Sequence, residues 1–101
     1  MGWGKRDWEK LIRTIAADTS QVAWTFHAKQ QMRQRHISMA MAIDVLQKGI
    51  IRLEPETDIK TGHTICRMER FCAGEKIAVC VALESRQARS CIVVTTMIIG
   101  A

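Results

Sequence analysis

The stretch KIAVCVALE, residues 76–84, decides the fold because bulky and small apolar side chains alternate along it. Successive side chains of a β-strand point to opposite faces of the sheet, so the bulky residues occupy one face and the small ones the other. The bulky set is Ile77, Val79, Val81 and Leu83, and the small set is Ala78, Cys80 and Ala82. We expect the bulky face to pack on helices and the small face to stay shallow.

Two more strands rich in Ile, Val and Thr flank this stretch, over residues 63–71 and 90–99. The connections are short enough for hairpins, so the simplest arrangement is an antiparallel meander. Upstream, residues 50–53 form a short strand that ends before Pro55, because proline cannot donate to a strand ladder. The polar residues 56–62 are predicted to form a loop. The sequence thus predicts a sheet of three to four antiparallel strands.

Three helices are predicted before the sheet. Apolar residues recur at helical spacing over residues 7–17, and a second helix covers residues 26–35 behind the N-cap Thr25. A third begins after Ser38 and stops at Gly49. These elements predict one α+β domain spanning all 101 residues, with the N-terminal helices packed on one face of the sheet and the other face partly open.

The charge balance favours an acidic partner. The formal net charge is +5, the pI is near 9.4, and nine of the fifteen cations are arginine, which suits bidentate phosphate contact. Residues 1–36 carry seven Lys or Arg against three Asp or Glu, a net +4, whereas residues 37–101 carry eight against seven. RNA, DNA or an acidic protein fits this balance.

The cysteines and histidines show no metal-ligand spacing. None of the four cysteines forms a C-x-x-C pair, so we expect reduced cysteines in the core and neither a metal nor another cofactor. No apolar run approaches membrane-spanning length, and the N-terminus leads into an amphipathic segment rather than an apolar leader. We therefore expect a cytoplasmic protein that does not enter a membrane.

A basic segment beginning at His27 contains the best candidates for chemistry. At about 100° per residue, His27, Gln31 and the Gln34/Arg35 pair share one side of the second helix. The Thr25 cap puts His27 in the first turn, where the helix dipole favours a neutral imidazole that can act as a base. The plainer alternative is that this side of the helix is only solvated, as charged helix faces usually are.

These residue types suit cleavage of RNA by its own 2′-hydroxyl group, which needs a base, an acid and a cation at the phosphate. We assign His27 as base or acid, Arg35 and Arg67 as phosphate clamps, and Thr95 as an orienting hydroxyl. The helix residues assigned to RNA binding are Lys29, Gln31, Arg33 and Gln34. The alternatives are an ion pair between Arg67 and Glu69 on the sheet face, and ordinary strand propensity for Thr95.

The same segment resembles the opening of a bacterial family of unknown function, which reads H-A-x-x-R-M-x-x-R-x-I. In register with that pattern are His27, Ala28, Met32, Arg35 and Ile37. The similarity covers residues 25–98 and leaves residues 1–24 as a helical extension. There are two departures: Gln31 stands where the family has its first arginine, and His36 stands where it usually has glycine.

Members of that family look like compact relatives of the RelE- and MqsR-type toxins, which are mRNA endonucleases, ribosome-dependent or free, neutralised by an antitoxin encoded beside them. The resemblance implies a RelE-like fold with a helical start packed on an antiparallel sheet. It also implies RNA, free or ribosome-bound, and a cognate antitoxin as partners. His27, Arg35 and Thr95 are the positions that match the family pattern.

The sequence therefore predicts a metal-independent ribonuclease of a toxin-antitoxin module that acts on mRNA or tRNA. The alternative is a non-catalytic module that binds RNA or a protein. A nuclease should lose turnover at His27 with binding retained, whereas a binder should lose affinity gradually as Arg33, Arg35 or Arg67 is neutralised. A third hypothesis is that the open sheet face or an edge strand forms a homodimer.

Overall fold

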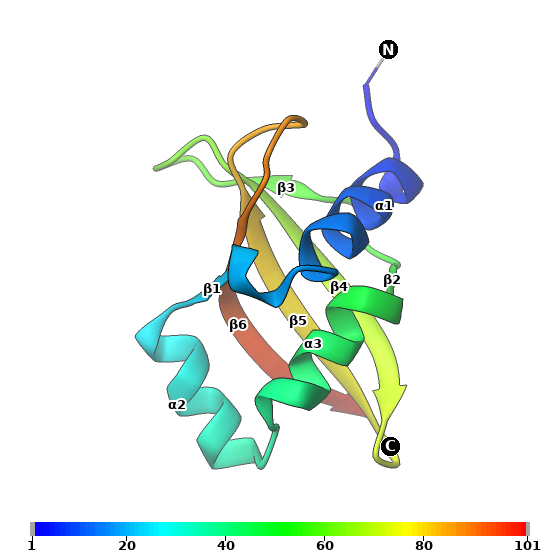
Figure 1. Cartoon of the computed structure of the whole chain (residues 1–101), viewed down its shortest axis with the longest axis vertical. Coiled ribbons are helices and arrows are strands. Elements are labelled where there is room, and N and C mark those ends of the chain that lie inside the picture. Colours follow the sequence, from blue (N-terminus) through cyan, green and yellow to red (C-terminus); the bar gives the residue numbers. More distant parts are fainter. Residues whose placement is uncertain (1, 101) are drawn as a thin grey trace.

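The computed structural model describes residues 2–100, which form helices on one side of a twisted sheet (Figure 1). The helices are α1 (Lys5–Ala16), α2 (Phe26–Arg35) and α3 (Met39–Lys48), with a 3₁₀ turn, η1 (Thr19–Gln21), after α1. The strands are β1 (Val22–Trp24), β2 (Ile50–Ile51), β3 (Glu56–Thr57), β4 (Thr64–Cys72), β5 (Glu75–Leu83) and β6 (Cys91–Gly100). The mixed α+β class predicted from the sequence is confirmed.

Within residues 2–100 the sheet has six strands rather than the predicted three to four. The antiparallel meander of β4, β5 and β6 forms its centre, as predicted. The short strand β1 pairs in parallel with β6, while β2 and β3 pair antiparallel with β4. The predicted loop over residues 56–62 therefore begins with a strand. The short strand predicted over residues 50–53 is confirmed as β2, whereas β1 and β3 were not predicted as strands. Two or three residues carry little pattern, and these strands form because the edges of the long strands offer unpaired backbone groups.

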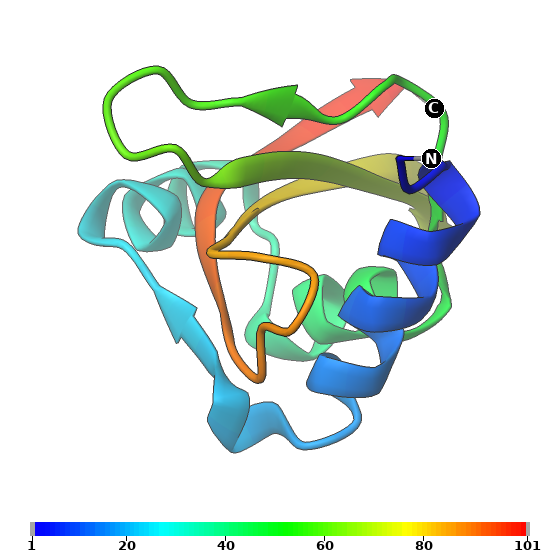
Figure 2. The same ribbon diagram turned by 90° about the horizontal axis from the view of Figure 1, so that it is seen from above.

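The two faces of β5 differ as the alternation predicts. Its bulky residues, Ile77, Val79, Val81 and Leu83, are fully buried in the core cluster. Helix α3 packs against β4 and β5 on this face, and α1 packs on α3. Figure 2 shows α1 and α3 on the same side of the sheet. The opposite face, which carries Ala78, Cys80 and Ala82, is called the open face below; on it Ala78 and Ala82 are themselves buried, and Cys80 is half-buried.

Helix α2 packs along β6, beyond the residues of that strand that pair with β1 (Figure 1). The Thr25 N–H donates to the Val93 carbonyl at 3.0 Å just before α2 begins. One turn into the helix, the Gln31 Oε1 atom accepts from the Thr96 N–H at 3.0 Å. Because Ala28 and Met32 are buried in the core, α2 closes the edge of β6 below β1.

The C-terminus of α2 gives a stability prediction. His36 ends the helix in the left-handed region, with φ of 56°, a conformation that favours glycine. We expect His36→Gly to increase the free energy of unfolding by about 1 kcal/mol, because a Cβ is strained in this region. His36→Ala should leave it within about 0.5 kcal/mol of wild type, since it removes the imidazole and keeps the Cβ. Urea denaturation of the three proteins measures both changes, and equal stability of the Gly and Ala variants would contradict the argument.

Candidate functional site

The open face brings two of the predicted site residues into one row. Arg67 on β4 is the direct neighbour of Cys80 on β5, and Cys80 is the direct neighbour of Thr95 on β6. Directly opposed residues point to the same face of an antiparallel sheet. The strand register therefore places a guanidinium and a hydroxyl on one surface, with the short Cys80 side chain between them.

Three of the cysteines, Cys66, Cys80 and Cys91, have thiols with raised pKa values. Burial raises the pKa of Cys80, Glu69 acts in the same direction, and the nearby Arg67 guanidinium only partly offsets them. Burial also raises the pKa of Cys66 to about 12 and that of Cys91 to about 11. All four cysteines are free thiols, and Cys66 and Cys91 are buried, as predicted, while Cys72 and Cys80 are half-buried. A thiol with a raised pKa is a poor nucleophile at neutral pH. We therefore assign no chemical role to Cys80, whose short side chain separates Arg67 from Thr95.

A buried carboxylate organises three cations on the same face. Glu69 is only 4% exposed. Its Oε2 lies 3.1 Å from Nε of Arg67, and its Oε1 lies 3.5 Å from both Nε of Arg52 and Nζ of Lys76. The ion-pair alternative for Arg67 is thus what the structure contains. One negative charge fixes the positions of three cations and leaves a local excess of positive charge, which suits an anionic ligand.

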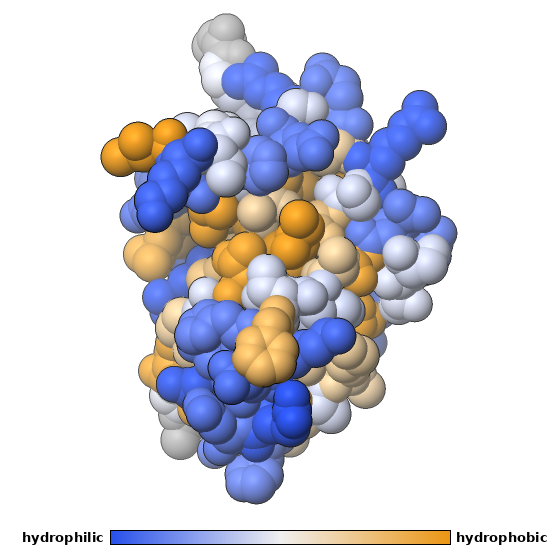
Figure 3. All heavy atoms as spheres, turned by 90° about the vertical axis from the view of Figure 1, so that its left-hand side faces the viewer, coloured by the Kyte–Doolittle hydropathy of each residue, from blue (hydrophilic) through white to orange (hydrophobic). Residues whose placement is uncertain are grey.

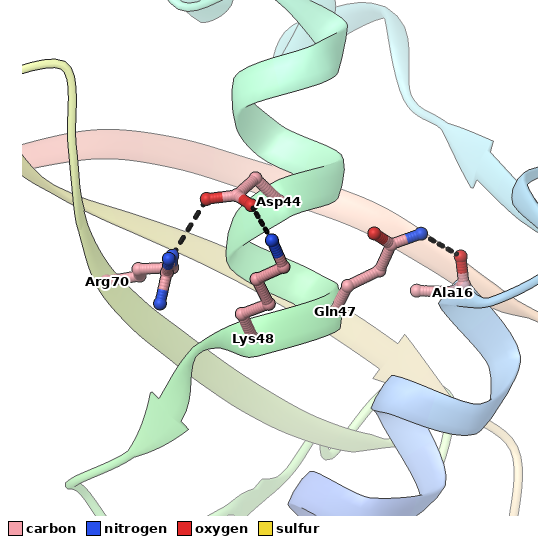
Figure 4. Close-up of polar contacts among 5 residues, drawn as sticks. All are labelled: Ala16, Asp44, Gln47, Lys48 and Arg70. Carbon is pink, nitrogen blue, oxygen red and sulfur yellow. Dashed lines mark hydrogen bonds and ion pairs between the residues drawn. The ribbon is translucent and has the colours of Figure 1, made fainter.

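A second carboxylate holds two more cations on the helical side of β4 (Figure 4). The Nε atom of Arg70 donates to Oδ2 of Asp44 at 2.8 Å, and Nζ of Lys48 lies 3.5 Å from Oδ1. The hydrogen bond from Arg70 lowers the pKa of Asp44, and Lys48 acts in the same direction. The cations Lys48, Arg52, Arg67, Arg70 and Lys76, with Asp44 and Glu69, are called the β4 basic cluster below.

Sequence analysis missed most of the β4 basic cluster. It assigned only Arg67 to the site and located the excess charge in residues 1–36. The alternation in β4 does place Arg67 and Glu69 on one face, which is the signal that could have identified part of the cluster. Arg52 and Lys76 gave no such signal, because they come from a segment after β2 and from β5 and meet Glu69 only through strand pairing.

His27 lies on the side of α2 that borders the open face. The predicted N-cap is confirmed, since the Thr25 hydroxyl oxygen accepts from the Ala28 N–H at 3.1 Å. Ala28 faces the core, and the next residue around the helix is Gln31, which contacts the edge of β6. His27 and Gln34 follow in the same direction around the helix, on the far side of Gln31 from Ala28. His27 is exposed, and within residues 2–100 no hydrogen bond or ion pair joins it to Arg67 or Thr95.

The other predicted RNA-binding residues of α2 are divided between two sides of the helix. Lys29 and Arg33 are exposed on the side away from Gln31, whereas Arg35 is exposed in the last turn. Figure 3, which faces the side where α2 lies, shows hydrophilic side chains gathered over the lower part of the molecule, hydrophobic ones across the middle and hydrophilic ones again near the top. Strands β5 and β6 lie between α2 and β4. The basic surface of α2 is for this reason separate from the β4 basic cluster.

Gln31 has a structural role that an arginine could not fill. Its Oε1 accepts from the backbone of the fully buried Thr96, and an arginine side chain has no acceptor. We expect Gln31→Ala to reduce the free energy of unfolding by about 1–2 kcal/mol, because the Thr96 N–H loses its partner. Gln31→Glu keeps the acceptor and should be near wild type. Chemical denaturation checks both variants, and equal losses in the two would show that the hydrogen bond contributes nothing.

The fold and the site define a small α+β domain with a cationic open sheet face. The chain belongs to the family described as Domain of unknown function (DUF4258), which matches residues 24–98. Helix α1 precedes the matched region, yet its Ile12 and Ile15 belong to the same core cluster as the sheet residues. Comparison with curated proteins and with solved structures found no match.

Two further observations concern residues 2–100. No group of three or more His, Cys, Asp or Glu side chains in this range is arranged to hold a metal ion. No helix in it is both long and apolar enough to cross a membrane.

Proposed function

We propose that this chain is a metal-independent ribonuclease of a toxin-antitoxin module, with a RelE-like fold, that cleaves mRNA or tRNA. The observation that carries the proposal is the row of Arg67, Cys80 and Thr95 on the open face, with His27 on the helix that borders it. A guanidinium, a hydroxyl and an exposed imidazole are the groups needed to cleave RNA through its own 2′-hydroxyl.

In the proposed reaction, His27 removes the proton of the 2′-hydroxyl, and the 2′-oxygen attacks the adjacent phosphorus. Arg67 stabilises the negative charge on the phosphorane, Thr95 orients the phosphate by a hydrogen bond, and Arg35 on α2 holds a neighbouring phosphate of the same RNA strand. The bond from phosphorus to the 5′-oxygen then breaks, the leaving oxygen takes a proton from solvent water, and the His27 imidazolium returns its proton to solvent. The products are a 2′,3′-cyclic phosphate and a free 5′-hydroxyl.

The proposed partners follow from the same resemblance. RNA, free or bound to the ribosome, is the substrate, and a cognate antitoxin is the inhibitor. A homodimer formed through the open face would cover Arg67 and Thr95, so this arrangement and RNA binding at that face exclude each other.

A non-catalytic RNA- or protein-binding module is the second candidate. Gln31 favours it, because the residue at the family's first arginine position is engaged with the Thr96 backbone rather than directed to a ligand. The β4 basic cluster favours it as well, since fixed cations bind phosphate without any need for a base.

End-group analysis of RNA tests the proposal. The purified protein is incubated with 5′-labelled mRNA and tRNA in EDTA. We expect cleavage that yields 2′,3′-cyclic phosphate and 5′-hydroxyl ends. Fragments with 5′-phosphate and 3′-hydroxyl ends would contradict attack by the 2′-hydroxyl. Intact RNA in the presence of folded protein would leave the binding module as the better account for the RNAs sampled.

A further inference from the structure

An exposed aromatic ring stands next to the β4 basic cluster. Phe71 is 58% exposed near the end of β4, directly opposite Lys76 on β5 and on the same face as Glu69. The chain has two phenylalanines, and the other, Phe26, is also exposed. The Phe71 ring is therefore on the surface beside cations, where a planar group that carries a neighbouring negative charge can stack on it.

Phe71 helps to line a shallow hollow of about 230 Å³ at this end of the sheet. The other lining residues are Lys48, Ile50, Arg52, Glu69, Arg70 and Lys76. The hollow is smaller than the pockets of about 300–1,000 Å³ that enclose a drug-sized molecule. It therefore suits one group of an extended ligand rather than a whole small molecule.

The charge at this site has the sign and arrangement that a phosphate backbone requires. On the open face, three cations of the β4 basic cluster surround the single carboxylate of Glu69, a local charge of +2. Lys48 and Arg70, with Asp44, add +1 on the helical side of β4, out of a net +5 for the whole chain. Both carboxylates are occupied by cations, and Glu69 is buried. The positive charge thus faces outward, while the acidic groups hold the cations in place.

We propose that Phe71 and the β4 basic cluster bind single-stranded RNA, with one unpaired base stacked on the Phe71 ring and the neighbouring phosphate held by Arg52 and Lys76. Stacking on an aromatic side chain requires an unpaired base, because the faces of paired bases are covered in a duplex. An acidic protein would satisfy the cations but would supply no regularly spaced planar ring beside each negative charge. This inference deepens the proposed function by naming the form of RNA that reaches the open face.

Binding of a non-cleavable probe tests the inference separately from cleavage. The probe is a fluorescein-labelled single-stranded oligonucleotide of mixed sequence with 2′-O-methyl groups, which lacks the 2′-hydroxyl nucleophile, and its anisotropy is measured with the full chain. We expect Phe71→Ala to weaken binding roughly 5- to 150-fold, the range for loss of one base–aromatic stack. Phe71→Trp should retain binding, and Phe71→Leu should lose about as much as Phe71→Ala.

Charge variants and a matched aromatic variant complete the experiment. Arg52→Ala and Lys76→Ala should each reduce the slope of log K against log salt by about 0.7, the contribution of one phosphate contact on a single strand. Phe71→Ala should leave that slope unchanged. The control is Phe26→Ala, which removes the other exposed phenylalanine and should bind as wild type.

Several outcomes would overturn the inference. Equal affinity of wild type and Phe71→Ala for the single strand would remove the stacking role. Binding of the hybridised duplex or of poly-glutamate as tightly as the single strand would show a general anion or protein-binding surface. Cleavage of RNA with no effect at Phe71 would leave the proposed function intact, whereas Phe71-dependent binding without cleavage would remove only the nuclease.

Discussion

Replacement of His27 by alanine should reduce the rate of RNA cleavage by about 100- to 10,000-fold, the usual contribution of a positioned base or acid. His27 is exposed in the first turn of α2, and its neighbours Thr25 and Ala28 form the N-cap without its side chain. The variant should therefore fold as wild type and bind the non-cleavable probe with unchanged affinity. Single-turnover cleavage of a labelled RNA, with anisotropy measured in parallel, separates turnover from binding.

The matched control for this change is His36→Asn. His36 is also exposed and lies on α2's C-terminal cap, and asparagine tolerates the left-handed conformation there. This variant removes an imidazole from the same segment without touching the proposed base, so it should cleave at the wild-type rate. An equal loss in both histidine variants, or no loss at His27, would contradict the assignment of His27 as the base.

Replacement of Gly49 by alanine should reduce the free energy of unfolding by about 3 kcal/mol, the upper part of the range for forcing an extra carbon into a packed site. Gly49 lies between the end of α3 and the start of β2. A Cβ there would overlap the Val45 carbonyl oxygen and lie 2.8 Å from the Glu69 carbonyl oxygen. Both obstacles are backbone atoms, so neither can move aside as a side chain does.

The reason for glycine at this position differs from the usual helix stop. Gly49 has φ of −74° and ψ of 178°, an extended conformation open to any residue. Its need for glycine comes from the close approach of α3 to β4 beside Glu69. The Arg13 guanidinium also donates to the Gly49 carbonyl at 2.7 Å, which ties α1 to the same point. We therefore expect Gly49→Ala to disturb the pairing of β2 with β4 and with it the position of Glu69.

Urea denaturation measures this loss, with Gly100→Ala as the control. No heavy atom lies within 4 Å of a Cβ built at Gly100, so that variant should stay within about 0.5 kcal/mol of wild type. A loss at Gly49 below about 1 kcal/mol would show that α3 and β4 can separate without strain. Probe binding by the Gly49 variant then tests whether the β4 basic cluster depends on this contact.

Local pattern was sufficient for the central sheet and the helices. The alternation in residues 76–84 predicted both the strand and the face that packs on α3, because a strand has a period of two whatever its partners. The caps Thr25 and Ser38 marked the starts of α2 and α3, since a side-chain oxygen satisfies an N–H group within the same turn. These features depend on residues within a few positions of one another.

The tertiary structure decided the register, the edges of the sheet and the composition of the site. Register places Cys80 between Arg67 and Thr95, and a shift of one residue would have sent Arg67 to the other face. The short strands at the two sheet edges and the Gln31 contact with β6 depend on backbone groups that the long strands leave unpaired. The sequence by itself therefore determined the three helices, the long strands and their buried faces, because periodicity is local. Only folding decided which charges meet, because the cations of the β4 basic cluster come from separate segments that only strand pairing and helix packing bring together.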